Sequence, residues 1–255
     1  MKIDTVEFDG ERVYPENYTH LRPLLYYHLA RYAFAKSLLR RGDKVVDIAC
    51  GSGYGTYELA SIAESVIGVD ISSVAIDYAR KNFPAGNIEF KIGDAISLDT
   101  MLSGSVDAVV SFETIEHLAD ADQDLFLDAA QKSLSRSGIL VISTPNTMVY
   151  SGGRATNNPH HLRELTIEQF REKLGKRFGV VQIFGQRKFE GSTAKGLMLL
   201  LGNVLVRFWK MNFRGLKFNG DIAQQTGDFE FPSYGLAACP YLIAVCKRPT
   251  AAVKE

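Results

Sequence analysis

The sequence predicts an α/β fold, a doubly wound and mostly parallel sheet of seven strands with helices on both faces. Three observations support this prediction. Strand-like apolar runs alternate with helical patterns along most of the chain, a glycine-rich turn follows the first such run, and the second run ends on Asp70. Alternation of this kind is typical of parallel strands joined by helical crossovers. The 255 residues and their 46% hydrophobic content suit a single domain, residues 1–255, with a proper core.

The elements begin with an N-terminal arm and helix over residues 1–40, where Leu24–Arg40 has apolar residues at helical spacing. Ser72 is a suitable N-cap for one of the helices that follow. An insertion at residues 190–235 interrupts the alternation before the last strand. Strands are expected at 44–49, 65–70, 88–92, 106–111, 138–143, 180–185 and 241–246. Helices are expected at 55–63, 73–83, 121–135 and 166–177.

The first strand leads into a glycine-rich turn, VVDIACGSGYGT at residues 45–56. Glycine lets a backbone turn sharply and approach a ligand without a Cβ in the way, so Gly51 and Gly53 mark a ligand-binding loop. The helix after the loop points its N-terminal amides at whatever lies over it. Asp70, at the end of the next strand, is placed to accept both ribose hydroxyls. Loop and carboxylate together predict a nucleoside pocket at the carboxyl edge of the sheet.

Two cofactor classes use such a pocket. The dinucleotide fingerprint is G-x-G-x-x-G, and here Thr56 stands at the third glycine position. Asp47, on the strand before the loop, is unfavourable for a pyrophosphate, whereas an amino-acid-bearing ligand with a cationic sulfur tolerates it better. We therefore expect S-adenosylmethionine (SAM), with Asp47 at its binding site, rather than NAD.

Charge and cysteine content exclude other classes of function. Lys+Arg and Asp+Glu both number 29, so no global basic field exists to recruit nucleic acid. Three cysteines without metal-ligand spacing, and an N-terminus unlike a signal peptide, favour a reducing, cytoplasmic location. No apolar run approaches the ~20 residues of a membrane-spanning helix. The Leu-rich segment 197–212 of the insertion either covers the domain's own core or contacts a membrane surface peripherally.

Over roughly residues 28–185 and the final strand, the chain resembles the Rossmann-fold SAM-dependent methyltransferases. VVDIACGSGYG is similar to the first motif of that family, with Ala49 in place of the usual first glycine. The expected strand order is 3-2-1-4-5-7-6. The resemblance implies these cofactor contacts: Asp70 to the ribose, Asp94 to the adenine amino group, Ile71 and Ala95 beside the ring, and Glu113, within FETIEHL, at the methionine end.

A narrower resemblance is to bacterial methyltransferases found with glycosyltransferases in surface-polysaccharide synthesis. The motifs that carry it are HLARYAFA at 28–35, ACGSGYG at 49–55, SFETIEHL at 111–118, STPN at 143–146 and NPHHLRELT at 158–166. That family usually has an aromatic residue where His160 stands, and its usual histidine and glutamate are at His161 and Glu164. The resemblance implies O-methylation of a sugar or glycan-linked acceptor.

A hydroxyl acceptor must lose a proton, and histidine is suited to take it near neutral pH. His161 and Glu164, three residues apart, are expected to act as base and orienting group, unless they only anchor the helix at 166–177. His117 is a second candidate, sharing a face with Glu113 if 114–118 is helical. The alternative is that His117 binds backbone and the adjacent Glu116 is solvated.

No metal site is expected, because the spacing of the acceptor-side residues does not by itself define one: His160, His161, Glu164 and Glu113.

Two other functions stay open. One is a methyltransferase acting on a small aromatic, quinone or natural-product acceptor, which the apolar 197–208 segment suggests. The other is a SAM-binding module without catalysis, although the acceptor-side histidines argue against it. A DNA or RNA acceptor is disfavoured, since no Asn/Asp-Pro-Pro-aromatic motif follows the fourth strand.

Overall fold

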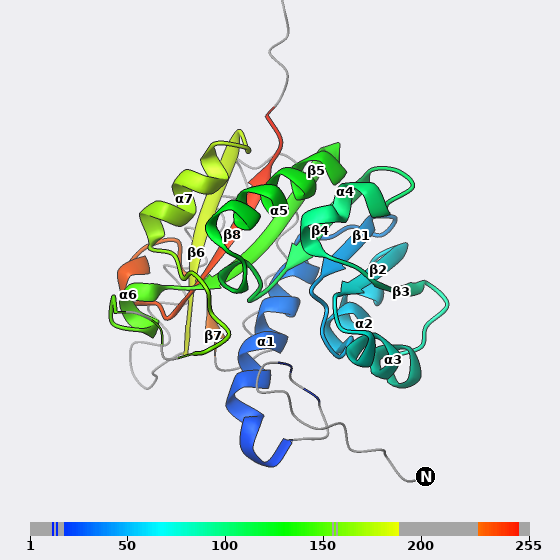
Figure 1. Ribbon diagram of the computed structural model, residues 1–255. Coiled ribbons are helices and arrows are strands. Elements are labelled where there is room, and N and C mark those ends of the chain that lie inside the picture. The colour runs from blue at the N-terminus through cyan, green and yellow to red at the C-terminus, as the bar shows by residue number, and fades with distance from the viewer. Residues whose placement is uncertain are drawn as a thin grey trace, which may run out of the picture.

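The computed structural model describes Arg12, Tyr14 and residues 18–154, 156, 158–188 and 229–249, with the backbone alone for 18–24. The described strands form one eight-stranded sheet in the order β3-β2-β1-β4-β5-β8-β6-β7 (Figure 1). The strands are β1 Lys44–Ile48, β2 Ser65–Asp70, β3 Ile88–Ile92, β4 Val106–Ser111, β5 Leu134–Pro145, β6 Val180–Lys188, β7 Phe229–Glu230 and β8 Tyr241–Lys247. The helices are α1 Tyr18–Leu38, α2 Tyr54–Ala60, α3 Ser73–Asn82, α4 Leu98–Met101, α5 Asp120–Ser133, α6 Thr147–Tyr150 and α7 Ile167–Gly175.

The α/β class and the mostly parallel sheet are confirmed, but the predicted strand count and order are wrong in one detail. β7 adds a two-residue eighth strand, antiparallel to β6, at the outer edge. β8, the last strand in the chain, lies between β5 and β6 and runs antiparallel to both, as in the predicted order of the long strands. β7 falls in the predicted insertion, whose residues 190–228, including 197–212, lie outside the described part of the chain.

The five strands from β3 to β5 are parallel, and β1 lies between β2 and β4. The order of strands therefore reverses next to β1, and the loops that leave β1 and β4 diverge there. In open α/β sheets, ligands bind in the crevice outside the carboxyl ends of the strands at such a point. The glycine loop, Asp70 and residues 112–118 all leave the sheet at this edge.

Helices cover both faces of the sheet, which explains why the central strands are apolar runs rather than alternating ones. Val46 and Ile48 of β1 pack with Phe126 of α5 and Phe170 of α7 on one face. Val45 packs on the opposite face in a second cluster that includes residues of α1 and α2. Figure 1 shows α5 and α7 over the first face. No described helix is long and apolar enough to cross a bilayer.

Most element boundaries agree with the predictions to within a few residues. The Ser72 hydroxyl accepts the backbone N–H of Ala75 at 3.2 Å and so caps α3 as predicted. Residues 114–118, considered as a possible helical segment, hold a single 3-10 turn at Ile115–His117 instead. This difference changes which side chains of FETIEHL lie together.

Candidate active site

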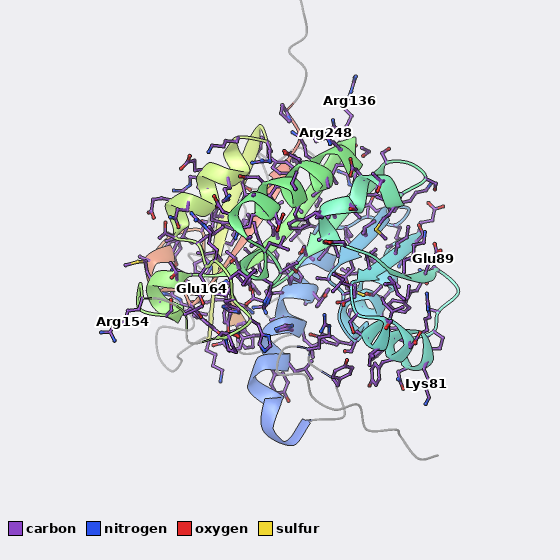
Figure 2. All side chains as sticks on the ribbon, viewed as in Figure 1. Lys81, Glu89, Arg136, Arg154, Glu164 and Arg248 are labelled. Carbon is purple, nitrogen blue, oxygen red and sulfur yellow. The ribbon has the colours of Figure 1, made fainter. Side chains whose placement is uncertain are left out.

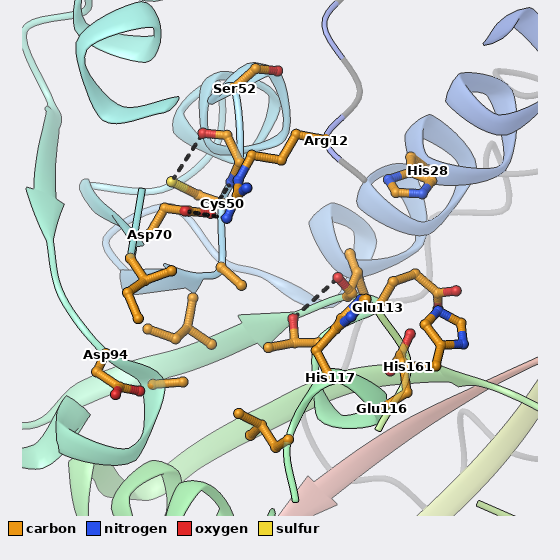
Figure 3. A pocket seen from close by; sticks show the side chains of 18 of the residues that line it. Arg12, His28, Cys50, Ser52, Asp70, Asp94, Glu113, Glu116, His117 and His161 are labelled. Carbon is orange, nitrogen blue, oxygen red and sulfur yellow. Dashed lines mark hydrogen bonds and ion pairs between the residues drawn. The ribbon is translucent and has the colours of Figure 1, made fainter. Parts of the chain in front are cut away.

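A cleft of about 460 Å³ opens at the carboxyl edge of the parallel strands. Its walls come from the loops after β1, β2, β3 and β4, from α1, and from the segment before α7. Figure 3 shows Asp70 and Asp94 at one end and Glu113, His117 and His161 at the other. The predicted site residues that line the cleft are Ala49, Gly51, Asp70, Ile71, Asp94, Ala95, Glu113, His117 and His161. The predicted site residues outside its lining are Asp47, Gly53 and Glu164.

The glycine loop turns through three residues with positive φ: Ala49 at 58°, Gly51 at 55° and Gly53 at 87°. A Cβ on Gly53 would lie 2.6 Å from the Cβ of Ala79, so this glycine lets the loop pack on α3. Its predicted role as a cofactor contact is not supported by its position. Ala49 carries a Cβ in a region that L-residues with side chains enter at a cost of about 1–2 kcal/mol.

Asp47 is fully buried and does not face the cleft. Its carboxylate accepts the hydroxyl of Tyr32 at 3.1 Å and that of Thr56 at 2.7 Å. Burial raises the pKa of Asp47 to about 7, although the two hydrogen bonds oppose that shift. The carboxylate therefore ties α1 and α2 to β1, and the interpretation of Asp47 as a cofactor ligand is not supported.

Asp70 is fixed at the nucleoside end of the cleft by backbone amides. Its two oxygens accept the N–H of Gly51 at 2.9 Å and the N–H of Ser72 at 2.8 Å. The Arg12 guanidinium, from the N-terminal arm, lies 3.1 Å from Asp70 Oδ1. The carboxylate is thus oriented by the loop it was predicted to work with, and Arg12 is a neighbour that the sequence did not point out.

Asp94 and Ile71 complete this end of the cleft. The Asp94 carboxylate accepts the N–H of Ile96 at 3.2 Å and caps the short 3-10 helix Ala95–Ser97. Ile71 is 66% exposed, which is unusual for an isoleucine and leaves an apolar surface at the cleft for a flat ring. The arrangement suits a ligand with a polar sugar between a ring and a charged tail.

Glu113 lies at the other end, with φ of 52°. Ser143 donates its hydroxyl to Glu113 Oε1 at 2.7 Å and accepts the Glu113 N–H at 3.1 Å. Arg31 Nη1 of α1 lies 4.0 Å from the same carboxylate oxygen. Glu113 is therefore turned toward β5 and α1. Since Ile115–His117 is a 3-10 turn, the helical condition under which Glu113 and His117 would share a face is not met.

Arg31 is a fully buried cation beside the cleft. Its Nη1 donates to Gln186 at 2.8 Å, and its guanidinium lies 4.9 Å from the ring centre of Tyr241. Its Nε and Nη2 have no hydrogen-bond partner among the described residues. One signal of this arrangement is visible in the sequence, a lone arginine within the apolar segment HLARYAFA.

Glu116 is fully buried, so the alternative in which it is solvated is wrong for this residue, although His117 does contact backbone as that alternative has it. One carboxylate oxygen accepts the Thr144 hydroxyl at 3.3 Å, and the other has no partner among the described residues. Its backbone carbonyl accepts the N–H groups of Leu162 and Arg163, which joins the 3-10 turn to the segment before α7. Burial raises the pKa of the Glu116 carboxyl well above its usual range, and the negative charge of Glu113 adds to this.

His161 and Glu164 form the predicted pair. His161 Nδ1 lies 2.8 Å from Glu164 Oε1, and Ser151 donates its hydroxyl to the other oxygen of Glu164 at 2.7 Å. Burial opposes ionisation of Glu164, but the hydrogen bonds from His161, Ser151 and Thr156 outweigh it and lower its pKa. Figure 2 shows Glu164 within the fold, whereas charged side chains such as Arg154 point outward.

His117 approaches the same pair from the 3-10 turn. Its Nδ1 lies 3.0 Å from the backbone carbonyl of His160, and its ring centre lies 4.9 Å from that of His161. Tyr150 of α6 also stacks against His161, with ring centres 5.7 Å apart. The two predicted histidines are thus brought together at one end of the cleft. The tyrosine between them and β8 was not predicted, because α6 has no apolar periodicity.

Comparison with known proteins agrees with this fold and site. Residues 39–183 match the model of a methyltransferase-domain family. A probable S-adenosylmethionine-dependent methyltransferase from Mycolicibacterium smegmatis is 34% identical over 170 residues, which cover 65% of this chain and 62% of that protein. A ubiquinone biosynthesis O-methyltransferase from Pelagibacter ubique is 31% identical over 110 residues, which cover 42% of this chain and 44% of that protein. The chain thus spans less than two thirds of either relative.

Among solved structures, the N-methyltransferase NodS from Bradyrhizobium japonicum, in complex with S-adenosyl-L-homocysteine, has a similar fold. The TM-score is 0.55 at 15% sequence identity, and the match covers 92% of each chain. At this identity the likeness concerns the fold alone. The family model accounts for more than half of the sequence, and this protein therefore belongs to the methyltransferase-domain family.

Proposed function

We propose that this protein is a SAM-dependent methyltransferase that methylates a hydroxyl group of a sugar or glycan-linked acceptor. The observation that carries the proposal is one continuous cleft with two chemically different ends. Asp70, held by the glycine loop, lies at the first end, and the His161–Glu164 pair lies at the second. This reaction needs a binding site for the donor nucleoside and a proton-accepting group, and the cleft provides both.

S-adenosylmethionine is the cofactor in this proposal. The carboxylate of Asp70 would accept the ribose hydroxyls, Asp94 would accept from the adenine amino group, and Ile71 with Ala95 would flank the ring. Ala49, Gly51 and Glu113 would face the methionine part from the loops after β1 and β4. Relatives named as SAM-dependent methyltransferases support this choice of cofactor.

The transfer needs alignment and removal of one proton, because the sulfonium is already a good leaving group. His161 takes the proton from the acceptor hydroxyl while the oxygen attacks the methyl carbon. The new O–C bond forms as the S–C bond breaks, its electron pair stays on sulfur, and S-adenosylhomocysteine leaves. Glu164 acts as a positioning residue, because its contact with Nδ1 orients the opposite edge of the His161 ring. His117 lies beside the pair as a second candidate base.

The polar acceptor end favours a hydroxylated, hydrophilic acceptor. Glu113, Glu116, His117 and Asn158 line it together with Tyr150, so a sugar finds several hydrogen-bond partners there. The motifs at 143–146 and 158–166 contain residues that line this end of the cleft or contact the residues that line it. The same two motifs are among those that resemble the polysaccharide enzymes. The relatives named ubiquinone O-methyltransferases favour an aromatic hydroxyl as the second candidate acceptor.

The free, buried thiols of Cys50, Cys239 and Cys246 support a reducing, cytoplasmic location.

Isotope-labelled SAM tests the proposal in two stages. Calorimetry first measures binding of SAM and S-adenosylhomocysteine, and the lack of any binding would reject the methyltransferase assignment. Label transfer is then compared between glycan precursors and a panel of catechols and quinols. Transfer to glycans alone supports the sugar acceptor, and transfer to the aromatic panel alone replaces it with the second candidate. His161→Ala should lower turnover and leave SAM affinity nearly unchanged.

A further inference from the structure

Three cleft residues form a compact group that the transfer mechanism does not fully use. Glu116, His117 and His161 each offer a ligand atom, and these atoms all lie within 4.8 Å of one another. We call these three residues the His–Glu cluster. Sequence spacing does not point to this set, because His161 is far from Glu116 in the chain and its segment is joined to Glu116 by the backbone N–H groups of Leu162 and Arg163. All three line the cleft at the end away from Asp70, as Figure 3 shows.

Glu116 is the first member that points to a ligand. Its side chain is fully buried, yet Oε1 has no hydrogen-bond partner among the described residues. A buried carboxylate oxygen without a donor is costly, and proteins resolve that cost by pairing the group or by binding a cation. One ligand atom of each imidazole ring lies within 4.8 Å of a Glu116 carboxylate oxygen. A cation between them would satisfy the carboxylate.

The two histidines are oriented as ligating histidines are. His117 contacts a backbone carbonyl through Nδ1, and His161 contacts the Glu164 carboxylate through Nδ1. Metal-bound histidines almost always make such a contact with the other ring nitrogen, which fixes the tautomer and the ring plane. In both rings the contact directs Nε2 to the opposite side. Glu164 is itself held by Ser151, so the orientation of His161 is supported by a second hydrogen bond.

We propose that the His–Glu cluster binds a divalent transition-metal cation such as Mn²⁺, Co²⁺ or Zn²⁺ at the acceptor end of the cleft. Imidazole ligands suit these cations, whereas an all-oxygen set would favour Mg²⁺ or Ca²⁺. Three protein ligands leave coordination positions open toward the cleft, which is the arrangement of catalytic rather than structural sites. Glu113 is engaged by Ser143 and is not part of the cluster.

A bound cation would deepen the proposed function, on which this part of the inference rests. A hydroxyl that coordinates the cation has a lowered pKa and loses its proton more readily. His161, as a ligand, would then not take that proton, which would pass to water in the open cleft. The oxygen would still attack the methyl carbon, with the S–C bond breaking as before. An acceptor with two adjacent hydroxyls, in a sugar or a catechol, would fill two open positions.

Cobalt absorption tests the site without any need for an acceptor. Tag-free protein, treated with a chelator and dialysed, is titrated with Co²⁺ while the visible ligand-field bands are followed. We expect saturation at one Co²⁺ per chain. Glu116→Gln and His161→Ala should each lose the bands or weaken binding at least tenfold, and Glu164→Gln should weaken it by about 10–100-fold. His160→Ala is the matched control, because His160 contacts His117 through its backbone carbonyl, which the substitution keeps.

Each outcome of the titration is decisive. Absence of bands at millimolar Co²⁺, or equal binding by the wild type, Glu116→Gln and His161→Ala, would overturn the metal site. Circular dichroism identifies a variant that fails to fold. If Glu116→Gln does not fold, His161→Ala, whose substitution lies on a loop, tests the metal site instead. SAM calorimetry on metal-free protein is measured in parallel. SAM binding without Co²⁺ binding rejects this inference alone, whereas Co²⁺ binding without SAM binding rejects the proposed function alone.

Discussion

Nδ1 of His161 lies 2.8 Å from Oε1 of Glu164, and the two side chains are only 6% and 4% exposed. A pair so well shielded is held in one geometry, since neither side chain can turn to water without breaking the contact. The same contact serves two proposed roles. It orients His161 as a base toward an acceptor hydroxyl, and it orients His161 as a ligand of a cation.

Glu164→Gln tests the contact directly. The amide is close in shape but carries no charge, so it supports His161 less well. We expect kcat to fall on the order of 10-fold to 100-fold, within the contribution of general-base catalysis. SAM affinity should not change, because Glu164 does not line the cleft. Steady-state kinetics with calorimetry separates the two effects, and an equal loss in SAM affinity would point to a purely structural role.

Asp70→Ala should weaken SAM binding. The carboxylate already accepts two backbone amides, and in the proposed complex it accepts the ribose hydroxyls as well. Hydrogen bonds to a charged group contribute about 1.5–3 kcal/mol, so we expect Kd to rise roughly 10-fold to 100-fold. Asp77→Ala is the control, because Asp77 lies on α3 with a 74% exposed side chain. Unchanged Kd in Asp70→Ala would remove Asp70 from the cofactor site.

Asp47 should make the stability of the protein depend on pH. Its pKa is raised from 3.8 to about 7 in the folded state, chiefly by burial. The folded state therefore holds this proton more tightly than the unfolded state, and stability falls as pH rises from about 4 to about 7. Asp47→Asn cannot ionise and should lack this fall. The free energy of unfolding of the variant minus that of the wild type should grow by on the order of 2–4 kcal/mol over that range.

Urea denaturation at several pH values checks the Asp47 prediction. Above pH 8 the difference between variant and wild type should be constant, because Asp47 is then ionised in both states. Asp43→Asn is a useful comparison, because burial also raises the pKa of this half-buried carboxyl on the loop before β1, so its effect should change with pH in the same direction. A difference that does not vary with pH would show that Asp47 is not the titrating group.

Arg31→Met should destabilise the fold, because the variant removes a partner from the buried Gln186 and from the partly buried Glu113. Gln186 loses its donor at 2.8 Å, and Glu113 loses the cation 4.0 Å away. Removing one member of a buried charged group costs about 3–5 kcal/mol, and the longer contact to Glu113 places our expectation at about 2–4 kcal/mol. Arg80→Met on the surface of α3 is the control. Chemical denaturation measures both, and equal losses would contradict a special role for Arg31.

The sheet could be predicted because its signals are local. Strand-like runs, the glycine turn and the Ser72 cap each depend on a few neighbouring residues, and all of them are present in the fold. β7 could not be predicted in this way. Phe229–Glu230 is a strand only because Arg187 and Lys188 of β6 lie beside it, and a two-residue segment carries no periodicity of its own.

The site was predictable where the sheet topology or one short segment supplies the geometry. Asp70 and Gly51 meet because each leaves the sheet at the same edge, and His161 meets Glu164 within one short loop. Asp47 and Glu116 were misjudged because distant segments bury them. Tyr32 of α1 covers Asp47, and the segment before α7 covers Glu116. A sequence shows that a residue can be charged, but its burial depends on which elements pack over it.

Ala49→Gly should stabilise the protein, although it removes a side chain. Ala49 has φ of 58°, in the left-handed region that costs about 1–2 kcal/mol for a residue with a Cβ and almost nothing for glycine. Glycine also gives the unfolded chain more conformational freedom, which lowers the free energy of unfolding by about 0.4–1 kcal/mol. The net gain should be about 0.5–1 kcal/mol in urea denaturation. Ala60→Gly, at the end of α2 where φ is helical, should instead lower stability by about 0.5–1 kcal/mol. If both variants lose stability, the strain at Ala49 is already relieved by its surroundings, and the alanine is held there for its contacts in the loop.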